Sequence, residues 1–166
     1  HTTVGFQVRH IFTMLGGSFD AFEGEVQVDQ ANPAASSVSF TIQTASINTR
    51  EPKRDEHLRS PDFFDVAKFP TMTFVSKKVL VENGKLSKVL GDLTIRGITR
   101  EVTLDVAEFT PAIKDPWGLS RRGATATTTI NRKDFGLSYS QALETGQLLL
   151  GEEVWITLEV DGLLAP

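Results

Sequence analysis

The stretch RDEHLRSPDFF at residues 54–64 holds the densest group of side chains that could do chemistry. It places Arg54, Asp55, His57 and Arg59 within six residues, followed by two phenylalanines. A metal site needs several imidazole or carboxylate ligands that converge at a set spacing. The chain has only three histidines, at positions 1, 10 and 57, and the Asp55–His57 spacing splays the two side chains on a helix. We therefore predict no metal site here.

Hydrolysis and acid–base catalysis are the other chemistries to weigh. A serine hydrolase needs a nucleophile held on a tight turn, and the chain has no G-x-S-x-G motif. Acid–base work by Asp55 and His57 stays open, but a solvated, ion-paired helix face explains the same residues more simply. Pro52 suits a first helical turn, and a helix over 52–59 sets Asp55 and Arg59 four residues apart in the favourable order. The prediction is that the protein is not an enzyme and has no catalytic residues.

The same stretch indicates a helical insertion near 51–66 rather than a strand. Ser60, Pro61 and Asp62 form the start signal of a second short helix, which would deliver Phe63 and Phe64. A polar helix followed by a phenylalanine pair has the composition of a plug over the mouth of a hollow structure.

Period-2 alternation dominates the rest of the chain and predicts half-buried strands. It is clearest in VWITLEVD at 154–161, and in the first strand it puts Val4, Phe6, Val8, His10 and Phe12 on one face. We predict strands at 2–12, 17–29, 36–47, 71–81, 85–95, 99–110, 121–131 and 152–163. Tight turns at Gly16-Gly17, Asn83-Gly84 and Arg96-Gly97 join several of them, since positive φ angles suit these pairs.

The 166 residues predict one all-β domain over 1–166. Eight mostly antiparallel strands with short turns form a closed barrel or a sandwich, and a barrel of this size is either filled or holds one small ligand. Gly91 and Ala126 on inward faces favour empty space beside phenylalanines. A tapered solid core is the alternative.

Composition excludes several classes of function. The chain carries 17 basic and 21 acidic residues, a net charge of −4, so a nucleic-acid partner is not expected. It has no cysteine and no apolar run long enough to span a membrane as a helix. Because it begins at His1 within a strand pattern, we expect that the N-terminus has been trimmed.

Several segments together resemble the YceI-like family, in order along nearly the whole chain. They are VGFQVRH at 4–10, TASINT at 44–49, RDEHLRSPDFFDVAKFPTMTF at 54–74, GDLTIRGITREVTLDV at 91–106, INRKDFG at 130–136 and GEEVWITLEV at 151–160. The most specific part is the RD-x-HL…FF…FPT-x-TF block followed by GDLTI-x-G-x-T.

The resemblance implies an eight-stranded antiparallel lipocalin-like barrel around an apolar tunnel. It implies a non-catalytic binding or carrier module for a long isoprenoid or isoprenoid-tailed lipid, such as a polyprenyl diphosphate or ubiquinone, with no further cofactor required. It also implies a periplasmic or secreted setting. The alternatives are an enzyme acting on a prenyl lipid, a fatty-acid or fatty-amide binder and a solid-core interaction domain, and a homodimer stays open.

Inward faces and the motif positions supply the candidate site residues. The predicted tunnel wall consists of Phe6, Val8, His10, Phe40, Ile42, Phe63, Phe64, Met72, Phe74, Leu93, Ile95, Leu104, Val106, Ile156 and Leu158. The predicted polar mouth consists of Arg54, Asp55, His57, Asn131 and Arg132. In this scheme His10 is either an ionisable group in the tunnel or a satisfied core histidine, and Arg132 is a rim charge that could hold a ligand head.

Overall fold

A computed structural model gives the fold of the protein and describes residues 2–27, 29, 31–83, 85–107, 113–114, 116, 120–140 and 150–163. The elements in chain order are β1 (Thr3–His10), β2 (Thr13–Phe19), β3 (Phe22–Gln27), η1 (Pro33–Ala35), β4 (Ser37–Gln43), η2 (Thr44–Ser46), β5 (Ile47–Asn48), α1 (Pro52–Arg59), β6 (Thr71–Glu82), β7 (Lys85–Ile95), β8 (Ile98–Ala107), β9 (Ile113–Lys114), β10 (Ser120–Asn131), η3 (Arg132–Phe135) and β11 (Leu150–Leu163).

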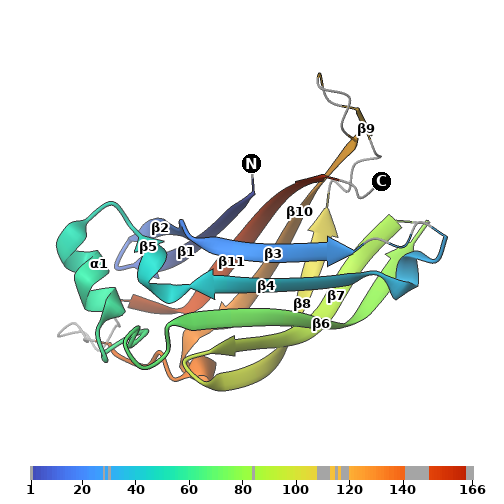
Figure 1. Ribbon diagram of the computed structural model, residues 1–166. Helices are drawn as coiled ribbons and strands as arrows, with labels where there is room; N and C mark the ends of the chain where they lie inside the picture. Colours follow the sequence, from blue (N-terminus) through green and yellow to red (C-terminus); the bar gives the residue numbers. More distant parts are fainter. Residues whose placement is uncertain are drawn as a thin grey trace.

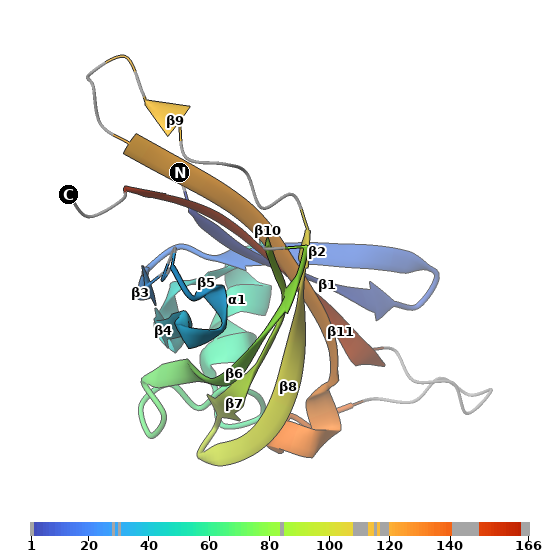
Figure 2. The ribbon, with the colours of Figure 1, turned by 90° about the vertical axis from the view of Figure 1, so that its right-hand side faces the viewer.

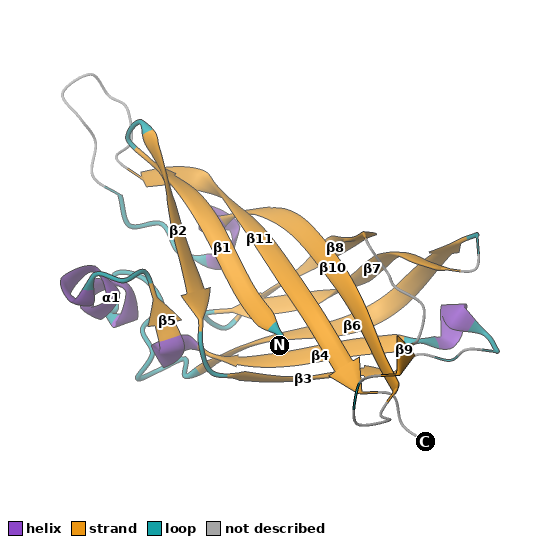
Figure 3. Cartoon of the chain, turned by 90° about the horizontal axis from the view of Figure 1, so that it is seen from above, coloured by secondary structure: helices purple, strands orange, loops and turns teal. Residues whose placement is uncertain are grey.

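The strands form one curled antiparallel sheet in the order β3-β4-β6-β7-β8-β10-β11-β1-β2-β5, with β9 paired to β10 (Figures 1, 2 and 3). The two ends of this path are β3 and β5. The chain brings them together, because β2 continues directly into β3 and β4 continues through η2 into β5. The Asp20 amide donates to the Ser46 carbonyl at 3.1 Å, and the Gln43 amide donates to the Ala21 carbonyl at 2.9 Å. The described strands confirm the predicted lipocalin-like fold, although the sheet path has ten strands, and the predicted eight are obtained only if each of these broken strands is taken as one.

The first hairpin turns at Ile11 and Phe12, so the predicted turn at Gly16-Gly17 is wrong. Ile11 takes a positive φ of 56°, and His10 pairs with Thr13. Gly17 instead lies within β2 opposite Phe6, whose ring would come within 2.5 Å of a Cβ at that position. The glycine therefore marks the close approach of a ring, and Phe12 lies at the hairpin tip with 83% of its surface exposed.

The other two turns agree with the prediction. Arg96 and Gly97 have φ angles of 53° and 74° between β7 and β8. Asn83 has a φ of 52°, and Glu82 pairs with Lys85 across a two-residue connection. Gly84, the other half of that turn, lies outside the described residues.

Helix α1 lies at one end of the barrel (Figure 1). It begins at Pro52 as predicted, and the Glu51 side chain accepts a hydrogen bond from the Lys53 amide at 3.4 Å. The predicted second helix is wrong, because the chain after Arg59 folds into hydrogen-bonded turns. The Asp65 amide donates to the Ser60 carbonyl at 2.9 Å, and Asp65 itself has a left-handed φ of 49°, which stops helix propagation.

Three phenylalanines on the inner face lie over glycines of a neighbouring strand. Gly17 accommodates Phe6, Gly24 accommodates Phe40 and Gly91 accommodates Phe74. A ring lying over a glycine fills the space that the missing side chain would leave. The expectation that Gly91 opens empty space is therefore wrong, and the lumen is shaped by where these rings lie.

Among the helices of the described residues, none has the length and apolar character needed to cross a bilayer.

Candidate functional site

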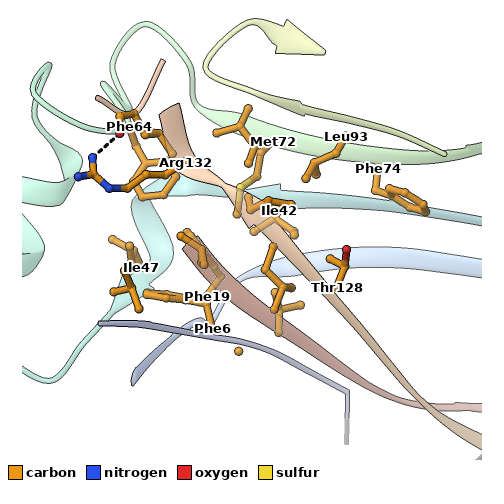
Figure 4. Close-up of a pocket in the computed structure, with 18 of the residues that line it drawn as sticks. Phe6, Phe19, Ile42, Ile47, Phe64, Met72, Phe74, Leu93, Thr128 and Arg132 are labelled. Atoms are coloured by element: carbon orange, nitrogen blue, oxygen red, sulfur yellow. Dashed lines mark hydrogen bonds between the residues drawn. The ribbon is translucent and has the colours of Figure 1, made fainter. Parts of the chain in front are cut away.

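The barrel encloses an apolar cavity of about 130 Å³ (Figure 4). Its wall holds side chains from β1, β2, β4 to β8, β10 and β11, together with residues from α1 and from the segments that follow α1 and η3. Among the described residues of that wall, Thr128 and Arg132 are the only ones with polar side chains. A surface of this kind excludes water and selects ligands by shape rather than by functional group.

Phenylalanines close the end of the cavity that faces α1. Leu58 from the helix and Phe63 and Phe64 from the turns behind it line the cavity. Phe64 meets Phe19 edge-on with ring centroids 5.7 Å apart. The insertion therefore delivers its phenylalanine pair to the lumen although no second helix forms.

The structure brings most of the predicted tunnel residues together on this wall. They are Phe6, Val8, Phe40, Ile42, Phe63, Phe64, Met72, Phe74, Leu93, Ile95, Leu104, Ile156 and Leu158. Contact of these residues with a ligand stays a prediction.

Two predicted tunnel residues lie elsewhere. His10 is exposed, because the β1–β2 hairpin projects past the barrel rim (Figure 2) and the β1–β11 register shifts between Val8 and His10. An ionisable group in the lumen at His10 is therefore excluded. Val106 is half-buried and packs against the core without lining the cavity, where it pairs with Ala126.

Several wall residues were missing from the predicted set: Phe19, Ile47, Leu58, Thr128, Ile130, Leu137 and Leu150. A signal existed for some of them. Thr128 and Ile130 continue the alternation of Ala124 and Ala126 along β10. Leu137 follows the turn η3 rather than a strand, and Leu150 lies two residues before the predicted start of the last strand at 152, so alternation did not identify either residue.

Arg54 and Asp55 hold the chain before α1 and do not reach the cavity. The Asp55 carboxylate is buried and accepts hydrogen bonds from the Thr49 amide at 2.9 Å and from the Thr49 hydroxyl. Arg54 donates to the Thr49 hydroxyl at 2.8 Å and to its carbonyl at 2.7 Å. The predicted Asp55–Arg59 pair does not form, because Arg59 donates to the carbonyls of Ala45 and Ile47.

His57 lies on the outer side of the same end. Its Nε2 is 2.8 Å from the Asp62 carboxylate, and its ring meets the rings of Phe63 and Tyr139 edge-on at 5.2 and 4.9 Å. His57 therefore packs on the back of Phe63 and is not part of the cavity wall.

Asn131 caps the turn η3. Its side-chain oxygen accepts from the Lys133 amide at 3.0 Å, and its amide donates to Glu152 at 3.4 Å. Lys133 also pairs with Glu152 at 2.9 Å. The Lys133 and Asn131 contacts, in that order, lower the pKa of Glu152 from its ordinary value.

Arg132 is a charged side chain of the wall, the one such among the residues that the structure describes there, and is 3% exposed. Its guanidinium turns away from Met72 and Ile42 (Figure 4) and binds backbone carbonyls. Nε donates to Gly151 at 2.8 Å, and the terminal nitrogens donate to Leu137, to Tyr139 at 2.8 Å and to Leu150 at 3.2 Å. Burial lowers the pKa of Arg132, and the nearby Glu152 acts in the opposite direction.

These contacts leave Arg132 little capacity for a ligand. An arginine has five N–H donors, and four of them point at carbonyls here. The aliphatic stem contributes to the cavity wall, whereas the charge ties residues 137–139 to residues 150–151. Its role as holder of a ligand head stays a prediction that has one donor at most to rest on.

Within the described residues, no three histidine or acidic side chains converge in a way that could hold a metal ion. The candidate site is the small and almost wholly apolar lumen of a lipocalin-like barrel. Barrels of this kind form a class of folds that can hold a small molecule. The YceI-like domain model matches residues 1–161, and the chain belongs to that family.

Similar proteins and similar solved structures support this family assignment. The UPF0312 protein SAS2572 of Staphylococcus aureus (strain MSSA476) is 43% identical over 156 residues, covering 93% of this chain and 88% of the relative. A Campylobacter jejuni YceI protein has a TM-score of 0.81 at 29% identity, covering 95% of this chain and 90% of its own. A polyisoprenoid binding domain from Saccharophagus degradans shares the fold, with a TM-score of 0.68 at 16% identity over 99% and 94% of the two chains.

Proposed function

We propose that this chain is a non-catalytic binding module that takes the apolar chain of an isoprenoid, or of a lipid with an isoprenoid tail, into its barrel. The observation that carries the proposal is the cavity itself, whose wall is apolar apart from Thr128 and Arg132. The polyisoprenoid-binding description of the Saccharophagus neighbour is consistent with it. A periplasmic or secreted setting stays a prediction.

The energetics favour an apolar guest. Burial of apolar surface contributes about 25 cal/mol per Å², so several hundred Å² of tail contribute on the order of 10 kcal/mol before the entropic cost of ordering the tail. Walls of Val, Leu, Ile and Phe measure girth and length. Selectivity among tails is therefore loose, and a fatty chain of similar girth competes.

Cavity size sets how a long tail must bind. A dry cavity of about 150 Å³ lined by Leu, Ile and Phe accepts a benzene-sized guest. The 130 Å³ of this lumen is close to that size, so it accepts a short piece of a branched chain without rearrangement. A longer tail enters only if the wall side chains move apart or if the rest of the tail leaves the lumen through an opening.

The non-catalytic part of the proposal rests on the chemistry of the wall. In the part of the cavity lining that the structure describes, no histidine or carboxylate lies beside Thr128, and four donors of Arg132 are engaged by carbonyls. A general base within hydrogen-bond reach of a nucleophile is what acid–base chemistry requires.

A pair of glutamate variants tests the proposal with farnesol, a 15-carbon isoprenoid alcohol, as the probe. Leu104→Glu puts a carboxylate on the cavity wall, where Leu104 is 5% exposed. Val75→Glu makes the same change on the outer face, where Val75 is 54% exposed. Titration calorimetry should show at least tenfold weaker binding for the first variant and unchanged binding for the second.

Circular dichroism checks that both variants are folded. If folded Leu104→Glu bound farnesol as well as the parent chain, or if the parent chain bound none, the proposal would be wrong.

A further inference from the structure

The sheet is splayed between β8 and β10. Among the described residues, three pairs join these strands, from Asp105↔Thr127 to Ala107↔Thr125. The ladders on either side are long, with eight pairs between β7 and β8 and eleven between β10 and β11. Beyond the last pair, residues 98–104 of β8 and 128–131 of β10 do not pair with each other, and η3 follows at the far end, where Arg100 donates to the Asp134 carbonyl at 3.2 Å.

A groove of about 710 Å³ fills this splayed seam on the outside of the barrel. Four residues line both the groove and the inner cavity: Val102, Thr128, Ile130 and Ile156. A residue that lines both spaces forms the partition between them. The seam is therefore the place where the lumen comes closest to the outer surface through the side of the barrel.

Thr128 lies on this partition and shows its hydroxyl oxygen in the lumen (Figure 4). It is half-buried, and its hydroxyl makes no hydrogen bond within the described part of the chain. An unpaired hydroxyl at the boundary between an apolar lumen and a mixed groove can bind the first polar atom of a guest whose tail lies inside.

The groove wall is mixed in polarity and close to neutral in charge. Its described lining holds one basic residue, Arg100, against three acids, Glu101, Asp105 and Asp134. Lysines outside the groove pair with two of these acids: Lys77 with Glu101 at 2.7 Å and Lys88 with Asp105 at 2.9 Å. A diphosphate with two or more negative charges finds no matching positive wall there.

Trp155 and Thr157 of β11, together with Thr127 and Thr129 of β10, complete the groove lining. A half-buried indole offers a flat apolar face, and hydroxyls supply donors and acceptors. This combination suits a flat or small uncharged head with hydrogen-bonding groups, such as a quinone ring, an alcohol or an amide.

We propose that the seam between β8 and β10 is the side entrance of the lumen and the seat of the ligand's polar end, and that this end is an uncharged hydrogen-bonding group. The inference rests on the proposed function, since it places the head of the lipid whose tail occupies the cavity. It also supplies the opening through which a tail longer than the lumen reaches the surface.

Fluorescence of Trp155 tests whether the polar end of the ligand binds in the groove. The chain has two tryptophans, and Trp117→Phe, at a position outside the described residues, leaves Trp155 as the only one. The probe is decylubiquinone, whose uncharged quinone ring quenches a tryptophan that it contacts. Equilibrium dialysis measures its binding independently, and we expect Trp155 emission to fall by more than half as binding saturates.

A bridged cysteine pair tests the entrance. The chain has no cysteine of its own. Continuing the β8–β10 register places Thr129 opposite Thr103, so Thr103→Cys/Thr129→Cys bridged by a short bifunctional thiol reagent closes the seam. The matched control is Ser39→Cys/Val75→Cys, a register pair of the intact β4–β6 ladder. Uptake of decylubiquinone should slow at least tenfold in the first variant and stay unchanged in the control.

The head-group charge gives a third readout. The parent chain should bind farnesol at least tenfold more tightly than farnesyl diphosphate, and Thr128→Val should weaken farnesol several-fold. Binding that leaves Trp155 unquenched, or uptake that bridging does not slow, overturns the inference while the proposed function stands. Tighter binding of the diphosphate overturns the uncharged head. Absence of any probe binding to the parent chain removes both.

Discussion

Replacement of Arg132 by methionine tests what this buried charge does. The side chain is 3% exposed, and its guanidinium donates to four backbone carbonyls on the two segments that flank residues 141–149. Methionine keeps the apolar stem that lines the cavity and removes all four hydrogen bonds. The carbonyls of Leu137, Tyr139, Leu150 and Gly151 then lose their charged donor.

The expected loss of stability follows from these contacts. A hydrogen bond to a charged group contributes about 1.5–3 kcal/mol, but four bonds to one group are not additive, and some carbonyls regain water. Removal of one partner from a buried charged arrangement costs about 3–5 kcal/mol, and we expect Arg132→Met to fall in that range. For a chain of this length the midpoint of thermal unfolding drops by about 10 °C.

Urea unfolding followed by tryptophan emission measures the change, with Arg132→Lys and Arg9→Met as companions. Lysine carries the charge as a point and cannot reach all four carbonyls, so we expect it to recover less than half of the loss. Arg9 is exposed, and its replacement should change the free energy of unfolding by less than about 0.5 kcal/mol. Full stability in Arg132→Met, or complete rescue by lysine, would refute the role of Arg132 as a clamp on these carbonyls.

Two further predictions concern Gly91 in the barrel wall and Asp20 in the connection between β2 and β3. A Cβ at Gly91 would lie 2.5 Å from the Val75 carbonyl oxygen, so Gly91→Ala should lower the free energy of unfolding by about 1–3 kcal/mol in urea titrations; Gly16→Ala, with only ordinary contacts at 3.8 Å or more, is the control and should change little. Asp20 accepts a hydrogen bond from Asn48 at 3.0 Å, the largest of the causes that lower its pKa from 3.8. Because the folded-state pKa is depressed, this carboxylate stabilises the fold above pH 3.8 and loses that effect as the pH falls through its lower folded value. The stability difference between the parent chain and Asp20→Asn should therefore shrink to nothing at low pH, and a difference independent of pH would contradict the assignment.

Alternation in the sequence predicts the barrel and much of its inner face. A strand has a side-chain period of two, so one confidently placed residue fixes the face of all its neighbours on the same strand. This is why Phe6, Ile42 and Leu104 could be assigned to the interior without any structure. The same rule fails where a strand outruns the barrel, since alternation continues past the rim and misplaces His10 and Phe12.

Polar groups were harder to place, because their partners are set by tertiary structure. Asp55 accepts hydrogen bonds from Thr49, and Arg132 donates to four backbone carbonyls. No sequence spacing predicts either set of partners. Local rules offered Arg59 as the partner of Asp55 and a ligand as the partner of Arg132. Backbone carbonyls from distant parts of the chain compete for Arg59 and Arg132, and nothing in the residue types signals how many of them lie within reach.

The number of residue pairs between neighbouring strands could not be predicted from the sequence either. The alternation of β8 and β10 gives no sign that residues 98–104 and 128–131 do not pair with each other, since an unpaired strand keeps the same inward and outward faces. Glycines within strands indicate close packing of a neighbouring ring, which a rule that treats glycine only as a turn residue does not consider. Gly17 and Gly91 mark the places where Phe6 and Phe74 lie against the neighbouring strand.

Binding of an apolar guest requires a lumen that is empty of the protein's own atoms and accessible to such guests. Diffraction from a crystal held under xenon gas tests this directly, because xenon occupies dry apolar cavities of about this volume. We predict xenon density inside the barrel, in contact with Phe6, Ile42 and Ile156. A map that shows these side chains packed together, with no xenon among them, would contradict the account.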